Sequence, residues 1–160
     1  MAAKMDLILW RHAEAFELRE GGEVTDDLAR ALTPKGERQA QRMAGWLNRH
    51  LTAGTRVLAS PARRAQQTAQ ALDRRFKTVA ALAPDGTVEG LLAAVRWPDA
   101  REAVLVVGHQ PTLGMTAGYL LSGEPMGWSL RKGALLWLRA RERDDSLQVV
   151  LHAALAPDLL

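Results

Sequence analysis

The chain contains no cysteine among its 160 residues. Disulfide bonds, thiolate catalysis and cysteine-ligated zinc sites are therefore excluded. Aromatic residues are scarce, at 5% of the composition, and no apolar run is long enough to cross a membrane. The N-terminus has a single lysine and too short an apolar stretch for a signal peptide. We therefore expect a cytoplasmic protein that does not bind membranes.

The basic residues form no dense block. Lysine and arginine number 21 against 18 acidic residues, which gives a formal net charge of +3. They are scattered among Glu and Asp without an aromatic–glycine stacking motif, so nucleic acid is not an expected partner. There is also no zinc-binding helix motif and no aspartate cluster with the spacing of a magnesium site. We expect a protein without a metal or other cofactor, whose local arginines can attract a phosphorylated substrate.

The length and composition predict one globular domain over residues 1–160. Hydrophobic residues make up 48% and charged residues 24%, as in ordinary soluble proteins. A chain of this length can bury a sizeable core, and no repeat, low-complexity tract or linker divides it. Residues 1–5 are interpreted as a loose leader.

Alternating strand and helix signals predict an α/β protein. Strands are expected at 6–10, 56–60, 103–108, 134–140 and 147–153. Helices are expected from 33 to about 50, from 61 onward, over 88–95 and from 111 to about 121. The run 103–108 is continuous and β-branched, as a central parallel strand should be. This order predicts a three-layer α/β/α sandwich with a mostly parallel central sheet and a C-terminal hairpin.

A long polar stretch, 14–32, separates the first predicted strand from the first predicted helix. It contains Gly21-Gly22 and shows no clear period, so we expect a partly irregular loop. Long loops in compact domains are often functional. We therefore expect this segment to lie above the end of the first strand as a flap.

Polar residues capable of chemistry follow three of the predicted strands. The first strand ends in Arg11-His12, and the central one is followed by His109. A third, 56–60, delivers the pair Arg63-Arg64 one turn into a helix. Open α/β sheets place their ligand sites at the carboxyl ends of strands, so these side chains are expected to meet at one edge if the strands are neighbours.

Two imidazoles and two guanidiniums are suited to phosphoryl transfer. Arginine offers planar, permanently charged donors that match phosphate oxygens. A neutral imidazole can attack phosphorus, and nearby arginines would lower its pKa and keep it neutral. We expect His12 to be the nucleophile and Arg11 to hold the phosphate. The alternatives are bystander histidines at ordinary strand ends, or a non-catalytic phosphate- or phosphoprotein-binding module, which would keep the arginines but need not keep His12 and His109.

Three segments resemble the signature motifs of the histidine phosphatase superfamily, also called the phosphoglycerate-mutase-like family. They are Leu9-Trp10-Arg11-His12-Ala13, Ser60-Pro61-Ala62-Arg63-Arg64-Ala65-Gln66-Gln67-Thr68-Ala69 and Val106-Val107-Gly108-His109. The resemblance implies a phosphoglycerate-mutase-like fold and a covalent phosphohistidine intermediate on His12. It also implies that Arg11, Arg64 and His109 complete a cofactor-free catalytic and substrate-binding pocket. Arg64 is preferred to Arg63 because the motif places its arginine four residues after the serine.

Within this superfamily the chain is most similar to the small SixA-type phosphohistidine phosphatases. Ala13 replaces the glycine of the mutases, and Gly108-His109-Gln110-Pro111 resembles the Gly-His-x-Pro form of this subgroup. Residues 27–36 resemble its Asp-x-x-Arg-x-Leu-Thr-x-x-Gly segment. We interpret Asp27 and Arg30 as a local ion pair that holds the flap. The resemblance implies a phosphohistidine protein as the substrate.

The general acid is not fixed by any motif. Larger family members place a carboxylic acid between the second and third motifs, and the candidates in this chain are Asp85, Glu89 and, near the first motif, Glu14. A phosphoramidate leaves as a neutral imidazole if its ring is already protonated, so it needs less acid help than an alkoxide. This favours phosphohistidine as the substrate. The alternative is a phosphatase with the same pocket that acts on a small-molecule phosphate ester.

Overall fold

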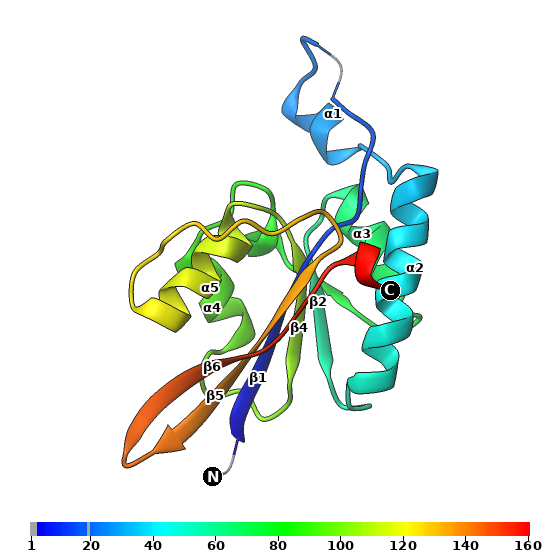
Figure 1. Cartoon of the computed structure of the whole chain (residues 1–160). Helices are drawn as coiled ribbons and strands as arrows, with labels where there is room; N and C mark the ends of the chain where they lie inside the picture. Colours follow the sequence, from blue (N-terminus) through cyan, green and yellow to red (C-terminus); the bar gives the residue numbers. More distant parts are fainter. Residues whose placement is uncertain (1–2, 19) are drawn as a thin grey trace.

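The computed structural model describes residues 3–18 and 20–160, and a six-stranded sheet of order β3-β2-β4-β1-β5-β6 forms its centre (Figure 1). The strands are β1 (Ala3–Arg11), β2 (Arg56–Ala59), β3 (Lys77–Thr78), β4 (Val104–Gly108), β5 (Leu135–Arg143) and β6 (Ser146–Leu155). The helices are α1 (Val24–Leu28), α2 (Pro34–His50), α3 (Arg63–Gln70), α4 (Val88–Val95) and α5 (Thr112–Ser122), with short 3₁₀ turns η1 (Ala80–Leu82) and η2 (Pro157–Leu159).

The sheet is mostly parallel, as the sequence predicts. β1, β2, β3 and β4 run parallel to one another, and β4 is buried at all five positions between β2 and β1. β5 and β6 are antiparallel and form the predicted hairpin. Asp144 and Asp145 link them, and both have positive φ, as a two-residue type I′ turn requires.

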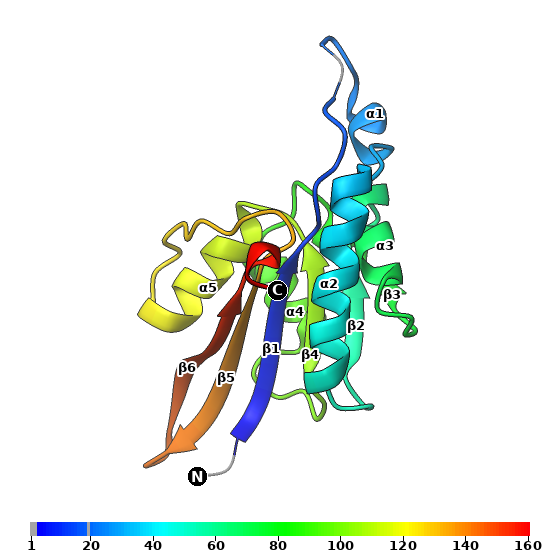
Figure 2. The ribbon, with the colours of Figure 1, turned by 45° about the vertical axis from the view of Figure 1, so that its right-hand side comes forward.

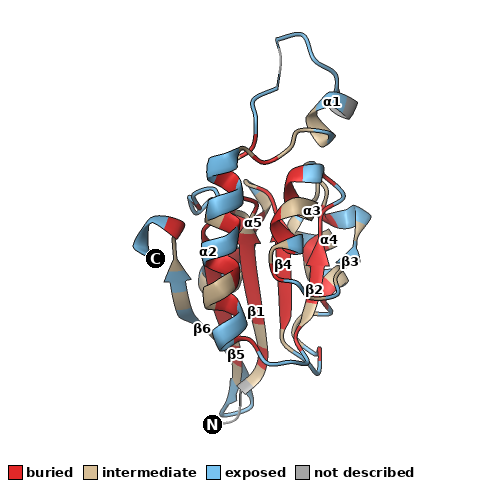
Figure 3. Ribbon diagram, turned by 90° about the vertical axis from the view of Figure 1, so that its right-hand side faces the viewer, coloured by how far each residue is buried: buried red, intermediate tan, exposed pale blue. Residues whose placement is uncertain are grey.

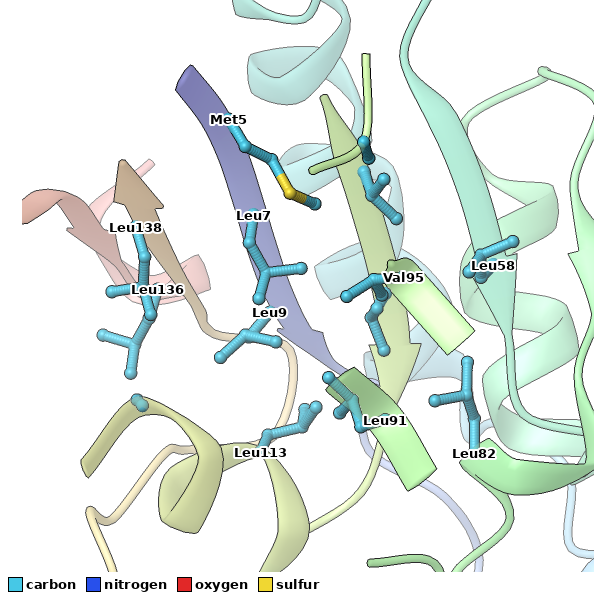
Figure 4. Close-up of a cluster of buried hydrophobic side chains, with 14 of the residues drawn as sticks. Met5, Leu7, Leu9, Leu58, Leu82, Leu91, Val95, Leu113, Leu136 and Leu138 are labelled. Carbon is cyan, nitrogen blue, oxygen red and sulfur yellow. The ribbon is translucent and has the colours of Figure 1, made fainter. Parts of the chain in front are cut away.

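Side chains of β1 alternate between two apolar cores, one on each face of the sheet. Leu7 and Leu9 pack with residues of α4 and α5 (Figure 4). Ile8 and Trp10 pack on the opposite face with α2 and α3. Successive side chains of a strand point to opposite faces, so a strand covered on both sides needs an unbroken apolar run. The result is the predicted α/β/α sandwich, and Figure 2 shows α5 and α2 on opposite sides of β1.

Helix α2 begins and ends where the sequence predicts. The hydroxyl of Thr33 accepts a hydrogen bond from the backbone N–H of Gly36 at 3.0 Å, and Pro34 occupies the first helical position. The spacing of three and four residues buries one side of the helix against the sheet (Figure 3). Its buried residues are Gly36, Ala40, Met43, Ala44 and Leu47.

Several boundaries differ from the sequence-based expectation. The hairpin strands are longer than predicted, since β5 runs to Arg143 and β6 to Leu155. β1 begins at Ala3, so residues 3–5 belong to the sheet; residues 1–2 of the expected leader lie outside the described residues. α3 begins at Arg63 rather than at Pro61, because Ser60 first makes a turn in which its hydroxyl accepts the N–H of Ala62.

The described residues of the segment 14–32, which are 14–18 and 20–32, project beyond the C-terminal end of β1 (Figure 1). The base of the segment is closed by a bridge between Ala15 and Leu32 and by a hydrogen bond from the Phe16 N–H to the Ala31 carbonyl. The segment is less irregular than expected, because it includes the short helix α1. Within residues 3–18 and 20–160, no helix has both the length and the hydropathy of a membrane span.

Candidate active site

The two predicted histidines lie side by side at the carboxyl edge of the sheet. His12 directly follows β1 and His109 directly follows β4, and these strands pair so that Arg11 lies opposite Gly108. The His12 N–H donates to the Gly108 carbonyl at 3.0 Å, which extends the ladder by one bond. The two imidazole centroids are 5.2 Å apart and the rings are tilted by 52°.

His12 is held in one tautomer by its own backbone. Its Nδ1 lies 2.7 Å from the Ala13 carbonyl oxygen. A carbonyl can only accept, so in the neutral ring Nδ1 carries the proton and Nε2 keeps a free lone pair. Burial lowers the pKa of His12 to about 3, and the charges of His109, Arg64 and Arg11 act in the same direction. At neutral pH the His12 imidazole is therefore neutral, with a proton on Nδ1 and a basic lone pair on Nε2.

His109 is fixed by a buried serine at the end of β2. Its Nε2 lies 2.7 Å from the Ser60 hydroxyl oxygen, which also accepts the N–H of Ala62 at 3.1 Å. The hydroxyl can donate its own proton to Nε2, and the ring proton of His109 then resides on Nδ1. Burial, followed by the nearby Arg64 charge, lowers the pKa of His109 to about 3.

Both arginines are anchored through their terminal nitrogens. Arg11 donates from Nη1 to the Leu130 carbonyl at 2.8 Å. Arg64, in the first turn of α3, is only 3% exposed and donates to the Asp27 carbonyl at 2.9 Å and to the Asp27 carboxylate at 3.2 Å. Burial lowers the pKa of each guanidinium. The anchoring leaves Nε of each side chain uncommitted.

Donors without a protein partner are concentrated in this site. In the part of the chain that the structure describes, four buried side-chain nitrogens lack a hydrogen-bond partner: Arg11 Nε, Arg56 Nη1, Arg64 Nε and His109 Nδ1. Buried polar atoms are nearly always bonded, so such groups need an explanation. Three of the four belong to the residues that the sequence singled out. They can donate to the oxygens of a bound anion.

The flap is tied to the site by one carboxylate. Asp27 accepts from Arg30 Nε at 3.0 Å, which is the local ion pair expected from the sequence, and it also contacts Arg64. Burial favours a raised pKa for Asp27, but the guanidiniums of Arg64 and Arg30 outweigh it and hold the pKa below its usual value. Sequence reasoning missed both the Asp27–Arg64 contact and the contact of Ser60 with His109. The position of Ser60 at a strand end on the same edge was the available signal for the second.

None of the three candidate general acids is hydrogen-bonded to the predicted site residues within the described chain. The carboxylate of Glu14 accepts from the Thr33 hydroxyl at 2.7 Å, so it is committed to the start of α2. Asp85 and Glu89 are exposed. Glu89 lines a groove of about 540 Å³ that also includes Pro111, two residues after His109. Among residues 3–18 and 20–160, no group of three or more His, Asp or Glu side chains could hold a metal ion.

Comparisons with known proteins agree with this geometry. The family model described as the histidine phosphatase superfamily (branch 1) matches residues 7–86. The phosphohistidine phosphatase SixA of Escherichia coli is 32% identical over 123 residues, which cover 69% of this chain and 76% of that protein.

Solved structures give the same result over nearly the whole chain. A protein of Nakamurella multipartitia, proposed to be a phosphohistidine phosphatase SixA, superposes with a TM-score of 0.77 at 28% identity and covers 96% of both chains. The protein histidine phosphatase SixA complexed with tungstate superposes with a TM-score of 0.74 at 25% identity, over 97% of this chain and 99% of that one. The chain therefore belongs to the histidine phosphatase superfamily, and its similarity within that superfamily is to the SixA-type phosphatases.

Proposed function

We propose that this phosphatase hydrolyses phosphohistidine in a protein through a covalent intermediate on His12. One observation carries the proposal. The Nδ1 proton of His12 is engaged by the Ala13 carbonyl, which leaves Nε2 as a free base in a pocket with three uncommitted donors. An activated nucleophile beside donors for a developing anionic transition state is the arrangement that phosphoryl transfer requires.

In the first step, the lone pair of His12 Nε2 attacks phosphorus as the bond from phosphorus to the substrate imidazole breaks. The electrons of that bond remain on the leaving nitrogen, and the departing ring is neutral if its other nitrogen already carries a proton. Arg11 Nε, Arg64 Nε and His109 Nδ1 donate to the equatorial oxygens. The positive charge of the two guanidiniums and the direct N–H contacts of all three groups supply the stabilisation, and the proposed reaction needs no metal.

In the second step, water attacks the phosphoryl group on His12 and releases inorganic phosphate. The P–N bond breaks, and the electron pair returns to Nε2. The low pKa of His12, about 3, makes its neutral imidazole a good leaving group. The Ala13 carbonyl keeps the Nδ1 proton in place throughout both steps, so the same tautomer serves attack and departure.

Two observations favour phosphohistidine over an alkyl phosphate ester. The similar protein of Escherichia coli is named a phosphohistidine phosphatase. In the described residues, Glu14, Asp85 and Glu89 make no hydrogen bond to the site, and a leaving imidazole needs little acid help whereas an alkoxide needs much. The expected partner is therefore a phosphohistidine-containing protein.

The test compares a phosphohistidine protein with a panel of phosphorylated metabolites, with and without a metal chelator. Wild type should prefer the phosphoprotein and should yield an acid-labile phosphoenzyme on rapid quench. The His12→Asn variant, whose amide can still donate to the Ala13 carbonyl, should show neither turnover nor phosphoenzyme. Full activity of that variant would refute the mechanism. A preferred metabolite would refute the substrate assignment, and loss of activity on chelation would refute metal independence.

A further inference from the structure

A second recess, rich in positive charge, adjoins the candidate active site. It has a volume of about 520 Å³ and lies between the start of α2, the loop before β5 and the turn η2. We call it the basic groove, and it is lined by Arg11, Lys35, Gln39, Arg131, Lys132, Pro157 and Asp158. None of the residues other than Arg11 has a part in the proposed reaction.

A glycine allows the loop that forms one wall of the groove to pack closely against its neighbours. Gly133 adopts φ +80°, and a Cβ at this position would lie 2.8 Å from Pro157 Cγ and close to Gln39. Only a residue without a side chain lets the loop pack so tightly against η2 and α2. The Gly133 carbonyl also accepts a hydrogen bond from the buried indole of Trp10 at 2.9 Å. The wall that carries Arg131 and Lys132 is therefore fixed to the core.

The same loop is bonded to the proposed nucleophile. The Gly133 N–H donates to the His12 carbonyl at 2.9 Å, and the Arg11 N–H donates to the Ala134 carbonyl at 3.0 Å. Arg11 belongs both to the phosphoryl pocket and to the lining of the basic groove. A substrate chain whose phosphoryl group is held at His12 therefore has this groove within reach of its neighbouring residues.

Four cationic residues face one carboxylate in the groove. The carboxylate of Asp158 pairs with Arg131 at 3.3 Å. Lys35 and Lys132 are exposed, and neither has a carboxylate within 4 Å among the residues that the structure describes. Two lysines thus remain available to an external anion.

We propose that the basic groove binds acidic side chains of the substrate protein close to its phosphohistidine. This inference rests on the proposed function. The exposure of the charges favours carboxylates on a polypeptide over a second phosphate of a small molecule. The Arg131 side chain is 77% exposed, whereas the phosphoryl pocket holds Arg64 with 4% of its side chain exposed. Exposed cations give weak, salt-sensitive attraction that suits flanking residues, because tight phosphate capture needs buried donors.

The test uses two peptides with the same phosphohistidine, one flanked on both sides by Asp and Glu and the other by Asn and Gln. The measurement is the ratio of the two kcat/KM values for one enzyme, in which any effect on the chemical step cancels. An exposed pair is worth roughly 1.5-fold to 5-fold, so two lysines should give the acidic peptide an advantage of about 2-fold to 25-fold at low salt. The ratio should approach one at ~0.5 M salt, where charges are screened.

The variant K35Q/K132Q should bring the ratio close to one at low salt. Lys77→Gln, which removes an exposed lysine from β3 at the opposite end of the sheet, should keep the wild-type ratio. No preference in wild type, or a preference that survives K35Q/K132Q, would overturn the inference. So would better turnover of small diphosphorylated compounds than of the acidic peptide. Failure of the proposed function would give a different result. Wild type would then hydrolyse neither of the two peptides, or the His12→Asn variant would hydrolyse both of them.

Discussion

The free energy of unfolding should fall steeply between pH 7.5 and pH 5 because of His12 and His109. Burial lowers the pKa of each to about 3 in the folded protein, whereas an unfolded histidine titrates near ~6.5. Between these values the unfolded chain binds more protons than the folded one. The stabilisation is therefore complete above about pH 6.5 and is lost as the pH falls toward the folded pKa.

The size of the effect follows from the two pKa values. At pH 5, one such histidine reduces the unfolding free energy by about 2 kcal/mol relative to pH 7.5, and two reduce it by up to about 4 kcal/mol. Typical domains have roughly 5–15 kcal/mol in total, so the loss is large. Asp6 and Asp27 have lowered pKa values, so their contribution is present above their ordinary pKa and is lost only in stronger acid. Between pH 7.5 and pH 5, the predicted change in unfolding free energy therefore comes from the two histidines and not from these carboxylates.

Urea titrations at several pH values between 7.5 and 5 measure this dependence directly. The matched control is the double variant His12→Asn/His109→Gln, in which the Asn amide nitrogen can donate to the Ala13 carbonyl and the Gln amide oxygen can accept from the Ser60 hydroxyl. The control should lose most of the pH dependence in this range. A wild-type unfolding free energy that stays constant from pH 7.5 to pH 5, or a control as pH-dependent as wild type, would refute the reasoning.

Two further substitutions test the pocket and the loop beside it. Arg64→Lys should lower kcat/KM roughly a hundredfold, because a lysine cannot both bond Asp27 and donate to the phosphoryl group as Arg64 Nε does. Steady-state kinetics measure this, with the exposed substitution Arg63→Lys as the control. Equal activity of the two variants would contradict the prediction. Gly133→Ala should lower the unfolding free energy by about 2–4 kcal/mol, since the positive φ and the nearby proline leave no room for Cβ. Urea unfolding measures this change, with Gly54→Ala as the control because its Cβ would meet nothing within 4 Å. A difference below ~0.5 kcal/mol between the unfolding free energies of the two variants would count against the prediction.

Local patterns were sufficient to predict the interior elements of the fold. β4 is predicted by five consecutive apolar or small residues, and α2 by its cap at Thr33 and its apolar spacing. The start of β1 was missed because residues 3–5 pair with β5, where Met5 lies opposite Ala140. That pairing joins segments more than a hundred residues apart, so no local pattern at the N-terminus reveals it.

The positions of those site residues that directly follow a strand could be predicted from the sequence. The topology of a parallel sheet brings His12 and His109 together, and the structure confirms that they are adjacent. The contact of Asp27 with Arg64 joins residues 37 positions apart through a flap whose path is not fixed by any periodic pattern. The general acid could not be chosen for a similar reason, because Asp85, on a turn, and Glu89, in the first turn of α4, are both exposed and their orientation toward the site depends on packing elsewhere.

The ladder between β1 and β4 makes the spacing of the two proposed catalytic histidines intolerant of insertions and deletions. His12 and His109 each follow by one residue the paired positions Arg11 and Gly108. Removing one residue from either strand would shift one imidazole by about 3.3 Å and turn its side chain to the opposite face of the sheet. Conservative exchanges of the core residues would leave the offset between the rings unchanged. In this protein, the proposed chemistry therefore constrains the lengths of two strands more strictly than the identities of the apolar residues that compose them.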